Sequence, residues 1–313
     1  MSTELNIGFD YSHENRLVIE DPGFNDFIEF LFNSDFKLGK IQAGLTIKKL
    51  SKYNLFIIGV PTSNSFFSEQ EIKDVVEYVR AGGSLLLIND KGGDKANHNN
   101  LSELSQFFGI KFNPDILHDD KNYSKKPSRP VITSFKKHFI TRDVNRIIHS
   151  GGCTLTVANL KEIPELDIKP LAFSSDEHAW HEIHDGTNWV KKPVKNAPIL
   201  AAGHFGSGKI VAIGNLSIFS NLNDEYGIRA ADNFKLISNI VSWLLNKAYS
   251  ESSKKIQPIY CAFPIKQELY YWMRDKIEEG KWKSIDEIIN FALKVIKIRM
   301  TKQDDVKEDD DLS

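Results

Sequence analysis

The sequence predicts an α/β fold: a three-layer sandwich with a mostly parallel sheet over residues 1–248, followed by a small β-α-α module over residues 257–300. Two observations support this. In the first region, short apolar runs alternate with segments whose apolar residues recur at helical spacing, which is the pattern of strand-helix-strand crossovers. The second region has one strand-like and two helix-like segments. A linker at residues 249–256, rich in Ser and Lys, separates the two regions.

The clearest crossover lies at residues 54–89. Residues 54–61 form a continuous apolar run, which is typical of a strand buried on both faces. Ser68 and Glu71 then form a capping box that begins a helix, and this helix ends before Gly82. Residues 84–89 form the next apolar run. A strand, a helix and a strand at this spacing predict a right-handed parallel crossover.

The remaining elements of the first region add strands to the same sheet and helices to its faces. Each strand is expected where an apolar run is bounded by turn residues, and each helix where the apolar period is that of a helix. They are strands at residues 5–9, 153–157 and 170–173, a hairpin of residues 199–202 and 210–213, and helices at residues 24–32 and 231–245.

The C-terminal module is predicted as a strand, a helix, a turn and a second helix. The strand covers residues 260–265, and the first helix ends at Gly280. Ser284 and Glu287 form a capping box that begins the second helix. The acidic residues 301–313 are expected to form a disordered tail. The apolar stripes of the two helices are formed by Leu269, Trp272, Met273 and Ile277, and by Ile285, Ile288, Ile289, Ala292, Leu293 and Ile296.

These segments resemble the ribbon-helix-helix family of dimeric DNA-binding modules. The resemblance implies that two copies pair their strands and interlock their helices, so we expect a homodimer through residues 257–300. It also implies that Tyr260 faces DNA, and that Lys281, Lys283 and Ser284 lie near its phosphates. Because the outward residues of the strand cannot read a base edge, DNA binding is expected to be weak and non-specific.

The N-terminal domain resembles a known group in several places. Residues 53–59, the helix start at Phe67-Ser68-Glu69 and residues 79–87 look like class I glutamine amidotransferase-like domains. Residues 8–15 and 202–214 look closer to a subgroup that contains gliding-motility and intraflagellar-transport related domains and proteins of unknown function. The resemblance covers residues 5–247 and implies an amidotransferase- or flavodoxin-like sandwich.

The residues needed for amidotransferase catalysis are not found at the expected turn. In that family a nucleophilic cysteine lies on a sharp turn after a central strand. Here the turn after residues 84–88 begins with Asn89 and Asp90 and holds neither cysteine nor serine. Cys153 lies early in an apolar segment. Because a thiol hydrolase needs an exposed thiolate beside a base, we expect a protein that is not an enzyme.

No cofactor is expected. The segment Gly203-x4-Gly208-Lys209 matches most of a phosphate-binding loop, but it is followed by Ile210 and joins two strands, whereas such a loop must begin a helix.

Three histidines recur at a spacing of three residues. On a helix, His178, His181 and His184 could share a metal ion. A glycine and a tryptophan flank the segment, so an irregular polar loop is the favoured prediction and metal binding the weaker one. Trp180 and Glu182 of the same segment could line the edge of a ligand site.

The other ligand-binding candidates follow from the predicted fold. Open α/β sheets bind ligands beyond the carboxyl ends of their strands. The residues that follow those ends form a polar, mainly acidic rim, which could hold a small polar ligand such as a sugar, a cation or a partner peptide. They are Asp10, His13, Glu14, Thr62, Ser63, Asn89 and Asp90.

Composition narrows the functional class. The chain has 313 residues and a formal net charge of −2, which argues against binding polyanions by bulk charge. Its two cysteines are expected to be buried thiols in a reducing compartment. It has neither a leader nor an apolar run of about 18 residues, so we expect a cytoplasmic protein without a membrane partner.

The functional prediction is a non-catalytic scaffold or sensor that binds a ligand or a protein and dimerises through its C-terminal module. Two alternatives stay open: a ribbon-helix-helix transcription regulator with an N-terminal sensor domain, and a metal-assisted hydrolase.

Overall fold

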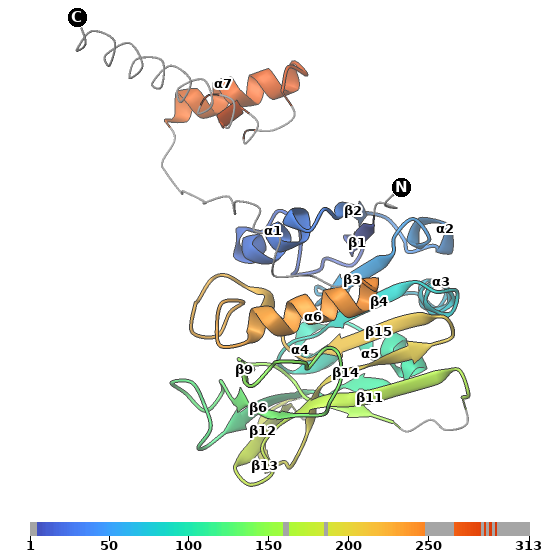
Figure 1. Ribbon diagram of the computed structural model, residues 1–313, viewed down its shortest axis with the longest axis vertical. Helices are drawn as coiled ribbons and strands as arrows, with labels where there is room; N and C mark the ends of the chain where they lie inside the picture. Colours follow the sequence, from blue (N-terminus) through green and yellow to red (C-terminus); the bar gives the residue numbers. More distant parts are fainter. Residues whose placement is uncertain are drawn as a thin grey trace, which may run out of the picture. The chain divides into compact units, whose positions relative to one another are not determined.

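The computed structural model describes residues 5–158, 163–184, 187–247 and 266–282, together with residues 285, 288, 289 and 292. These belong to two units, residues 1–250 and residues 251–313. The first unit confirms the predicted α/β class (Figure 1).

An eight-stranded sheet forms the middle of the first unit. Its strand order is β2-β1-β3-β4-β15-β14-β11-β8. The pairs from β2 to β15 are parallel, and the pairs from β15 to β8 are antiparallel, so the sheet is mixed. The strands are β1 Asn6–Asp10, β2 Lys37–Ile41, β3 Leu55–Gly59, β4 Ser84–Ile88, β8 Ser134–Phe135, β11 Leu166–Phe173, β14 Pro198–Phe205 and β15 Gly208–Ile213.

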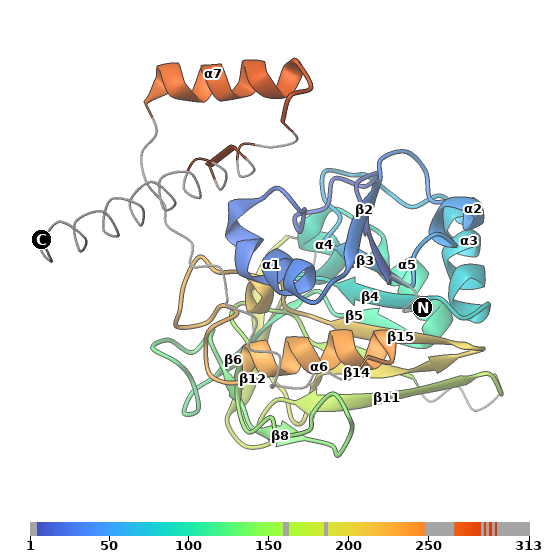
Figure 2. The ribbon, with the colours of Figure 1, turned by 45° about the horizontal axis from the view of Figure 1, so that its top comes forward.

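Helices cover both faces because successive side chains of the central strands point to opposite sides. Leu55 and Ile57 of β3 belong to the core that α1 (Asn25–Asn33) and α6 (Asn233–Leu245) close. Phe56 of β3 belongs to the core beneath α3 (Glu69–Arg80). Helices α1 and α6 lie side by side in Figures 1 and 2, and the rings of Phe30 and Phe234 have centroids 5.3 Å apart.

The crossover from β3 to β4 agrees with the sequence prediction. The Ser68 hydroxyl accepts from the Glu71 N–H, and the Glu71 carboxylate accepts from the Ser68 N–H, which is the complete capping box. Helix α3 ends at Arg80, just before Gly82. Its apolar residues at helical spacing are buried: Ile72, Val75, Val76 and Val79.

Two predictions about strands need correction. The strand expected at residues 153–157 is shorter: β10 (Leu155–Val157) pairs with β5 (Ile110–Phe112), outside the main sheet. The irregular loop expected around His178, His181 and His184 is wrong, because Ala179–His184 is strand β12. It pairs with β13 (Trp189–Pro193) and β6 (Asp115–Asp119).

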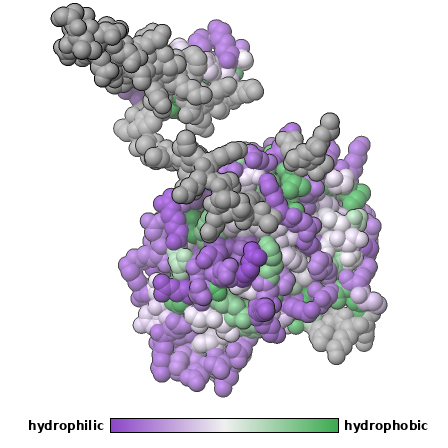
Figure 3. Space-filling model, viewed as in Figure 1, coloured by the Kyte–Doolittle hydropathy of each residue, from purple (hydrophilic) through white to green (hydrophobic). Residues whose placement is uncertain are grey.

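There is a physical reason why the sequence of this hairpin resembles that of a loop. All five residues of β13 are exposed, so the hairpin carries polar side chains on both faces and shows no apolar alternation. Figure 3 shows mainly hydrophilic residues at the end of the unit where Figure 1 places β12 and β13.

Short elements connect the larger ones. They are η1 Pro22–Phe24, α2 Ile47–Leu50, α4 Gly93–Asn97, α5 Leu101–Ser105, η2 Gln106–Phe108, the pair β7 Val131–Ile132 and β9 Ile147–Ile148, and η3 Ser217–Phe219.

In the second unit, the structure describes α7 (Gln267–Glu278). The helix ends at the predicted place, where Gly280 adopts the left-handed conformation with φ of 71°. Met273 of the predicted stripe is 2% exposed, whereas Leu269 and Trp272 are about half exposed. The predicted strand at residues 260–265, the Ser284–Glu287 capping box and the tail at residues 301–313 lie outside the described residues.

Candidate functional site

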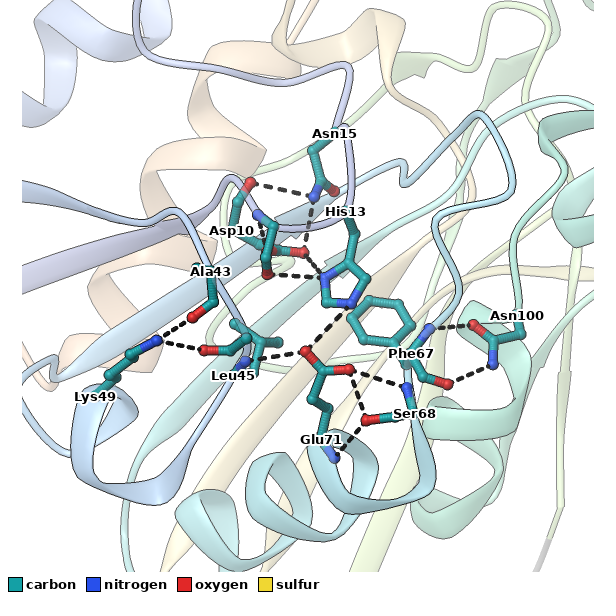
Figure 4. Close-up of polar contacts among 12 residues, drawn as sticks. Asp10, His13, Asn15, Ala43, Leu45, Lys49, Phe67, Ser68, Glu71 and Asn100 are labelled. Carbon is teal, nitrogen blue, oxygen red and sulfur yellow. Dashed lines mark hydrogen bonds and ion pairs between the residues drawn. The ribbon is translucent and has the colours of Figure 1, made fainter.

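The rim loop after β1 is held together around a buried carboxylate. Asp10 is 1% exposed. One of its oxygens accepts from the Ser12 N–H at 2.9 Å and from the Ser12 hydroxyl at 2.7 Å. The other lies 2.9 Å from His13 Nδ1 and accepts from the Asn15 amide at 2.8 Å (Figure 4). These partners satisfy both oxygens of Asp10 within the loop.

His13 connects this loop to the start of α3. Its Nε2 lies 3.6 Å from Glu71 Oε1, and its ring centroid is 3.9 Å from that of Phe67. Glu71 Oε1 also accepts from the Leu45 N–H at 3.0 Å (Figure 4). One buried imidazole and one carboxylate therefore join three segments: the loop after β1, the loop after β2 and the N-terminus of α3. We call Asp10, His13 and Glu71 the His13 clamp.

The charges of the clamp favour a protonated imidazole. Burial alone would lower the pKa of His13, but the carboxylates of Asp10 and Glu71 outweigh burial and raise it above its usual value. Burial would raise the pKa of Glu71, but hydrogen bonds from Ser68 and Leu45 and the charge of His13 lower it. The clamp is therefore a satisfied ion-pair network.

Asn89 and Asp90, the predicted residues after β4, are also engaged. Asn89 is fully buried and donates to Asp94 Oδ1 at 2.9 Å. Asp90 Oδ2 accepts from Arg16 Nη1 at 2.7 Å. Burial raises the pKa of Asp90, although Arg16 opposes that shift. The contact between Arg16 and Asp90 thus joins the loop after β1 to the loop after β4.

The remaining rim residues form an exposed tip. The Thr62 hydroxyl donates to the Glu14 carbonyl at 2.7 Å, and Ser63 follows on the surface. The Asn64 N–H donates to the His98 carbonyl at 3.0 Å. Four exposed residues here have a positive φ: Glu14 (45°), Ser63 (60°), Asn64 (61°) and His98 (52°). Such backbone is uncommon outside glycine, so neighbouring contacts must hold it in place.

Val60 is the rim residue that sequence reasoning missed. It directly follows β3, is fully buried and has φ of 63°. A β-branched residue in this region is an outlier that costs on the order of 1–3 kcal/mol. No sequence signal could have revealed it, because valine at the end of an apolar run is typical of an ordinary strand. A sharp strand-to-turn bend of this kind can present a nucleophile, but valine has none to present.

Cys153, the cysteine considered as a nucleophile, is buried and unreactive. Cys153 is fully buried, and burial raises the pKa of its thiol well above the ordinary value. A protonated, inaccessible thiol cannot attack a substrate.

The histidine segment does not gather around a common point. In a strand, residues three apart belong to opposite faces, so the spacing that would favour metal binding on a helix does not favour it in β12. His181 Nδ1 lies 2.7 Å from Asp115 Oδ2. Among the described residues, no group of three or more His, Cys, Asp or Glu side chains could hold a metal ion.

Trp180 and Glu182 belong to the same strand, in the three-stranded sheet and not on the rim loops. The Trp180 ring stacks on His118 at 3.9 Å, Lys191 Nζ lies 3.7 Å from its centroid, and its indole N–H donates to Asp120. The carboxylate oxygen Oε2 of Glu182 lies 3.5 Å from His118 Nε2. Burial lowers the pKa of His118. These contacts stabilise the hairpin.

The nucleic-acid candidates are mostly outside the described residues. That is the case for Tyr260, Lys283 and Ser284. Lys281 is described, and its ammonium forms an ion pair with Glu279 at 2.7 Å. In the part of the chain that the structure covers, no helix is long and apolar enough to cross a membrane.

Two comparisons with known proteins find similarity to the same kind of protein. The family model described as the IFT52 GIFT domain matches residues 9–156. The intraflagellar transport protein 52 homolog of Mus musculus is 23% identical over 305 residues, which cover 93% of this chain and 68% of that protein. Since only 7% of the chain lies outside the match, it must extend into residues 251–313.

Solved structures support the fold. The mmIFT52 N-terminal domain has a TM-score of 0.61 at 21% identity and covers 76% of this chain and 97% of that one. A cytoplasmic protein from Salmonella typhimurium LT2 has a TM-score of 0.51 at 13% identity and covers 77% and 99%. At these identities the likeness concerns the fold alone.

These findings correct two family resemblances. The assignment to class I glutamine amidotransferase-like domains is wrong, because the matching family model and the mouse relative are both of the IFT52 kind. The assignment of residues 257–300 to ribbon-helix-helix DNA-binding modules is also wrong, because the match to the mouse relative extends into this region. The expectation of DNA binding rested on this resemblance and is therefore dropped.

Proposed function

We propose that this chain is a non-catalytic, protein-binding subunit of an intraflagellar transport assembly. The observation that carries the proposal is the match to the mouse intraflagellar transport protein over 93% of the chain. The geometry of the sheet's carboxyl end supports it. Asp10, His13 and Asp90 are occupied by one another or by neighbouring loops, and the strained position after β3 holds a valine. Such an end suits a rigid scaffold.

The partner surface that we propose is the exposed tip of the rim, formed by Glu14, Ser63, Asn64 and Phe66. Phe66 is 52% exposed although it is a large apolar residue. Its neighbours have a positive φ and are tied to adjacent loops, so the tip is presented in one conformation. A rigid tip with an aromatic anchor loses little conformational entropy on binding, which favours protein recognition.

Phe107 provides a matched control for this surface, because it is another exposed phenylalanine, at 50%. The chain and its Phe66→Glu and Phe107→Glu variants would be tagged and expressed in ciliated mouse cells. We expect the parent chain in isolated cilia and in particles far heavier than its own 35.6 kDa on a sucrose gradient. Phe66→Glu should release most of it from the particles, whereas Phe107→Glu should not.

A parent chain that sediments at its own mass and is absent from cilia would overturn the transport proposal. Equal sedimentation of the two variants would overturn only the assignment of the tip. Detection of thiol-dependent amide hydrolysis that disappears in Cys153→Ala would contradict the non-catalytic part.

We also propose, more specifically, that the chain forms a homodimer through α7. Leu269, Tyr270, Tyr271 and Trp272 are each 40% or more exposed, which is an unusual amount of apolar surface for one short helix. We expect these side chains to be covered by a second copy. Light scattering should then give twice the chain mass, and a Tyr271→Lys, Trp272→Lys double variant should give the single mass. A monomeric parent chain at micromolar concentration would refute this part.

A further inference from the structure

A groove of about 410 Å³ lies at the edge of the sheet opposite to the rim, where β1, β3 and β4 begin. Its apolar lining comes mainly from Leu5, Ile47, Tyr53, Tyr78, Leu244 and Leu245. The remaining lining is backbone and small or polar side chains at the ends of α3 and α6. A volume of this size is in the range of pockets that hold a small ligand or a few side chains, roughly 300–1,000 Å³.

The walls of the groove are fixed by contacts between distant segments. The buried Tyr78 hydroxyl donates to the carbonyls of Tyr53 at 3.2 Å and Ser84 at 3.1 Å. The Ser84 hydroxyl donates to the Leu244 carbonyl at 2.7 Å, which ties the start of β4 to the end of α6. At Gly83 an added Cβ would lie 2.3 Å from the Tyr78 ring, so only glycine lets the ring lie against this wall. The groove is therefore preformed.

The exposed charges that flank the groove beside α2 are positive. None of its lining residues is acidic. Ile47 of α2 and Ser51, which directly follows that helix, line the groove, and Lys48 and Lys52, the residues after them, are exposed. Within the described ranges, neither lysine has a carboxylate partner within ion-pair distance. The ammonium of Lys209 reaches the same edge, where it donates to the Trp243 carbonyl at 2.6 Å.

We infer that this groove docks an acidic segment of a partner protein, which inserts an aliphatic or aromatic side chain between Ile47, Tyr53 and Leu244. The apolar lining supplies affinity for the inserted side chain, because its transfer from water is favourable. The lysines select acidic flanking residues and speed their approach. This docking site goes beyond the proposed rim surface and lies at the other end of the same strands.

The test begins with a peptide-phage selection on the immobilised full-length chain. The enriched peptides are then synthesised with fluorescein and measured by fluorescence anisotropy. Two groove variants are compared with the parent chain: a Lys48→Glu, Lys52→Glu double variant, which reverses the charge of the rim, and Ala81→Trp, which places a large side chain at an exposed lining position. The matched control is the Lys121→Glu, Lys126→Glu double variant, because these two lysines are exposed on a distant loop.

We expect peptides in which acidic residues flank one large apolar residue. The charge-reversed variant should raise their Kd by about tenfold or more, and 0.5 M NaCl should act in the same direction. Ala81→Trp should abolish binding, and the control should leave the Kd within about twofold of the parent value. Circular dichroism of each variant verifies the fold.

Three outcomes would overturn the inference. Enriched peptides could lack acidic residues, or their binding could be indifferent to both groove variants. Unlabelled chain could displace the peptide, in which case the occupant is a second copy. Inorganic phosphate at 10 mM could displace it completely, in which case the site recognises an anion and not a protein segment. Each result leaves the rim surface to be judged separately by the Phe66→Glu variant.

Discussion

Replacing His13 by leucine tests whether the His13 clamp is structural. The variant removes the partner 2.9 Å from Asp10, while that carboxylate stays 1% exposed, and it leaves Glu71 without its cation. A hydrogen bond to a charged group contributes about 1.5–3 kcal/mol, and breaking a buried pair costs about 3–5 kcal/mol. Leucine retains much of the packing against Phe67. We therefore expect a loss of about 3 kcal/mol in the free energy of unfolding.

The pH dependence of that loss is a sharper test. The pKa of His13 is raised in the folded state, so the stability it contributes is fully present below its unfolded pKa of about 6.5. This contribution disappears as the pH rises through the folded pKa. The difference between the parent chain and His13→Leu should consequently be larger at pH 6 than at pH 9.

Urea unfolding followed by tryptophan fluorescence at both pH values measures the difference. His204→Leu is the matched control, because His204 is exposed and forms no ion pair with any described residue. A loss below about 0.5 kcal/mol at pH 6, which is typical of a surface substitution, would refute the clamp. So would a loss that grows between pH 6 and pH 9, since that is the opposite sign.

Two further predictions concern other buried positions. Burial lowers the pKa of the fully buried His149 to about 4, so acid must charge it before or during unfolding. Between pH 7 and pH 4.5 the parent chain should lose about 2 kcal/mol more stability than His149→Leu in urea titrations, and equal losses would contradict this. Gly83→Ala should cost about 2 kcal/mol more than Gly23→Ala in thermal unfolding, because an added Cβ meets the Tyr78 ring at 2.3 Å in the first case and nothing closer than 3.1 Å in the second; similar costs would contradict the packing.

The central strands and the α3 helix could be predicted because their signals are local. The apolar runs of β3 and β4 and the Ser68 capping box need no knowledge of distant residues. Strand β2 has the sequence Lys-Leu-Gly-Lys-Ile and lies at a sheet edge, so its alternation was too weak to detect. Strand β12 pairs with β6, which is distant in the sequence and places His118 opposite Trp180, so its partner could not be found from local residues.

In the candidate site, too, local sequence signals could be predicted, whereas contacts between distant residues could not. Asp10 and His13 could be placed on the rim from the order of strand and turn residues alone. Glu71 could be recognised only as a capping residue, since its contact with His13 requires two loops to meet in space. Whether a polar rim residue is open to a ligand depends on such partners. The sequence therefore predicted where these side chains lie but not that they satisfy one another.

The place of β15 in the sheet has a consequence for synthesis on the ribosome. This strand, residues 208–213, joins two halves of the sheet that are otherwise unpaired with each other. A growing chain that has released β1 to β4 but not β15 exposes the open edge of β4, a row of unpaired backbone groups that can recruit another strand. The family match stops at residue 156, before this strand. A fragment cut there should aggregate, so the matched segment is not a unit of folding by itself.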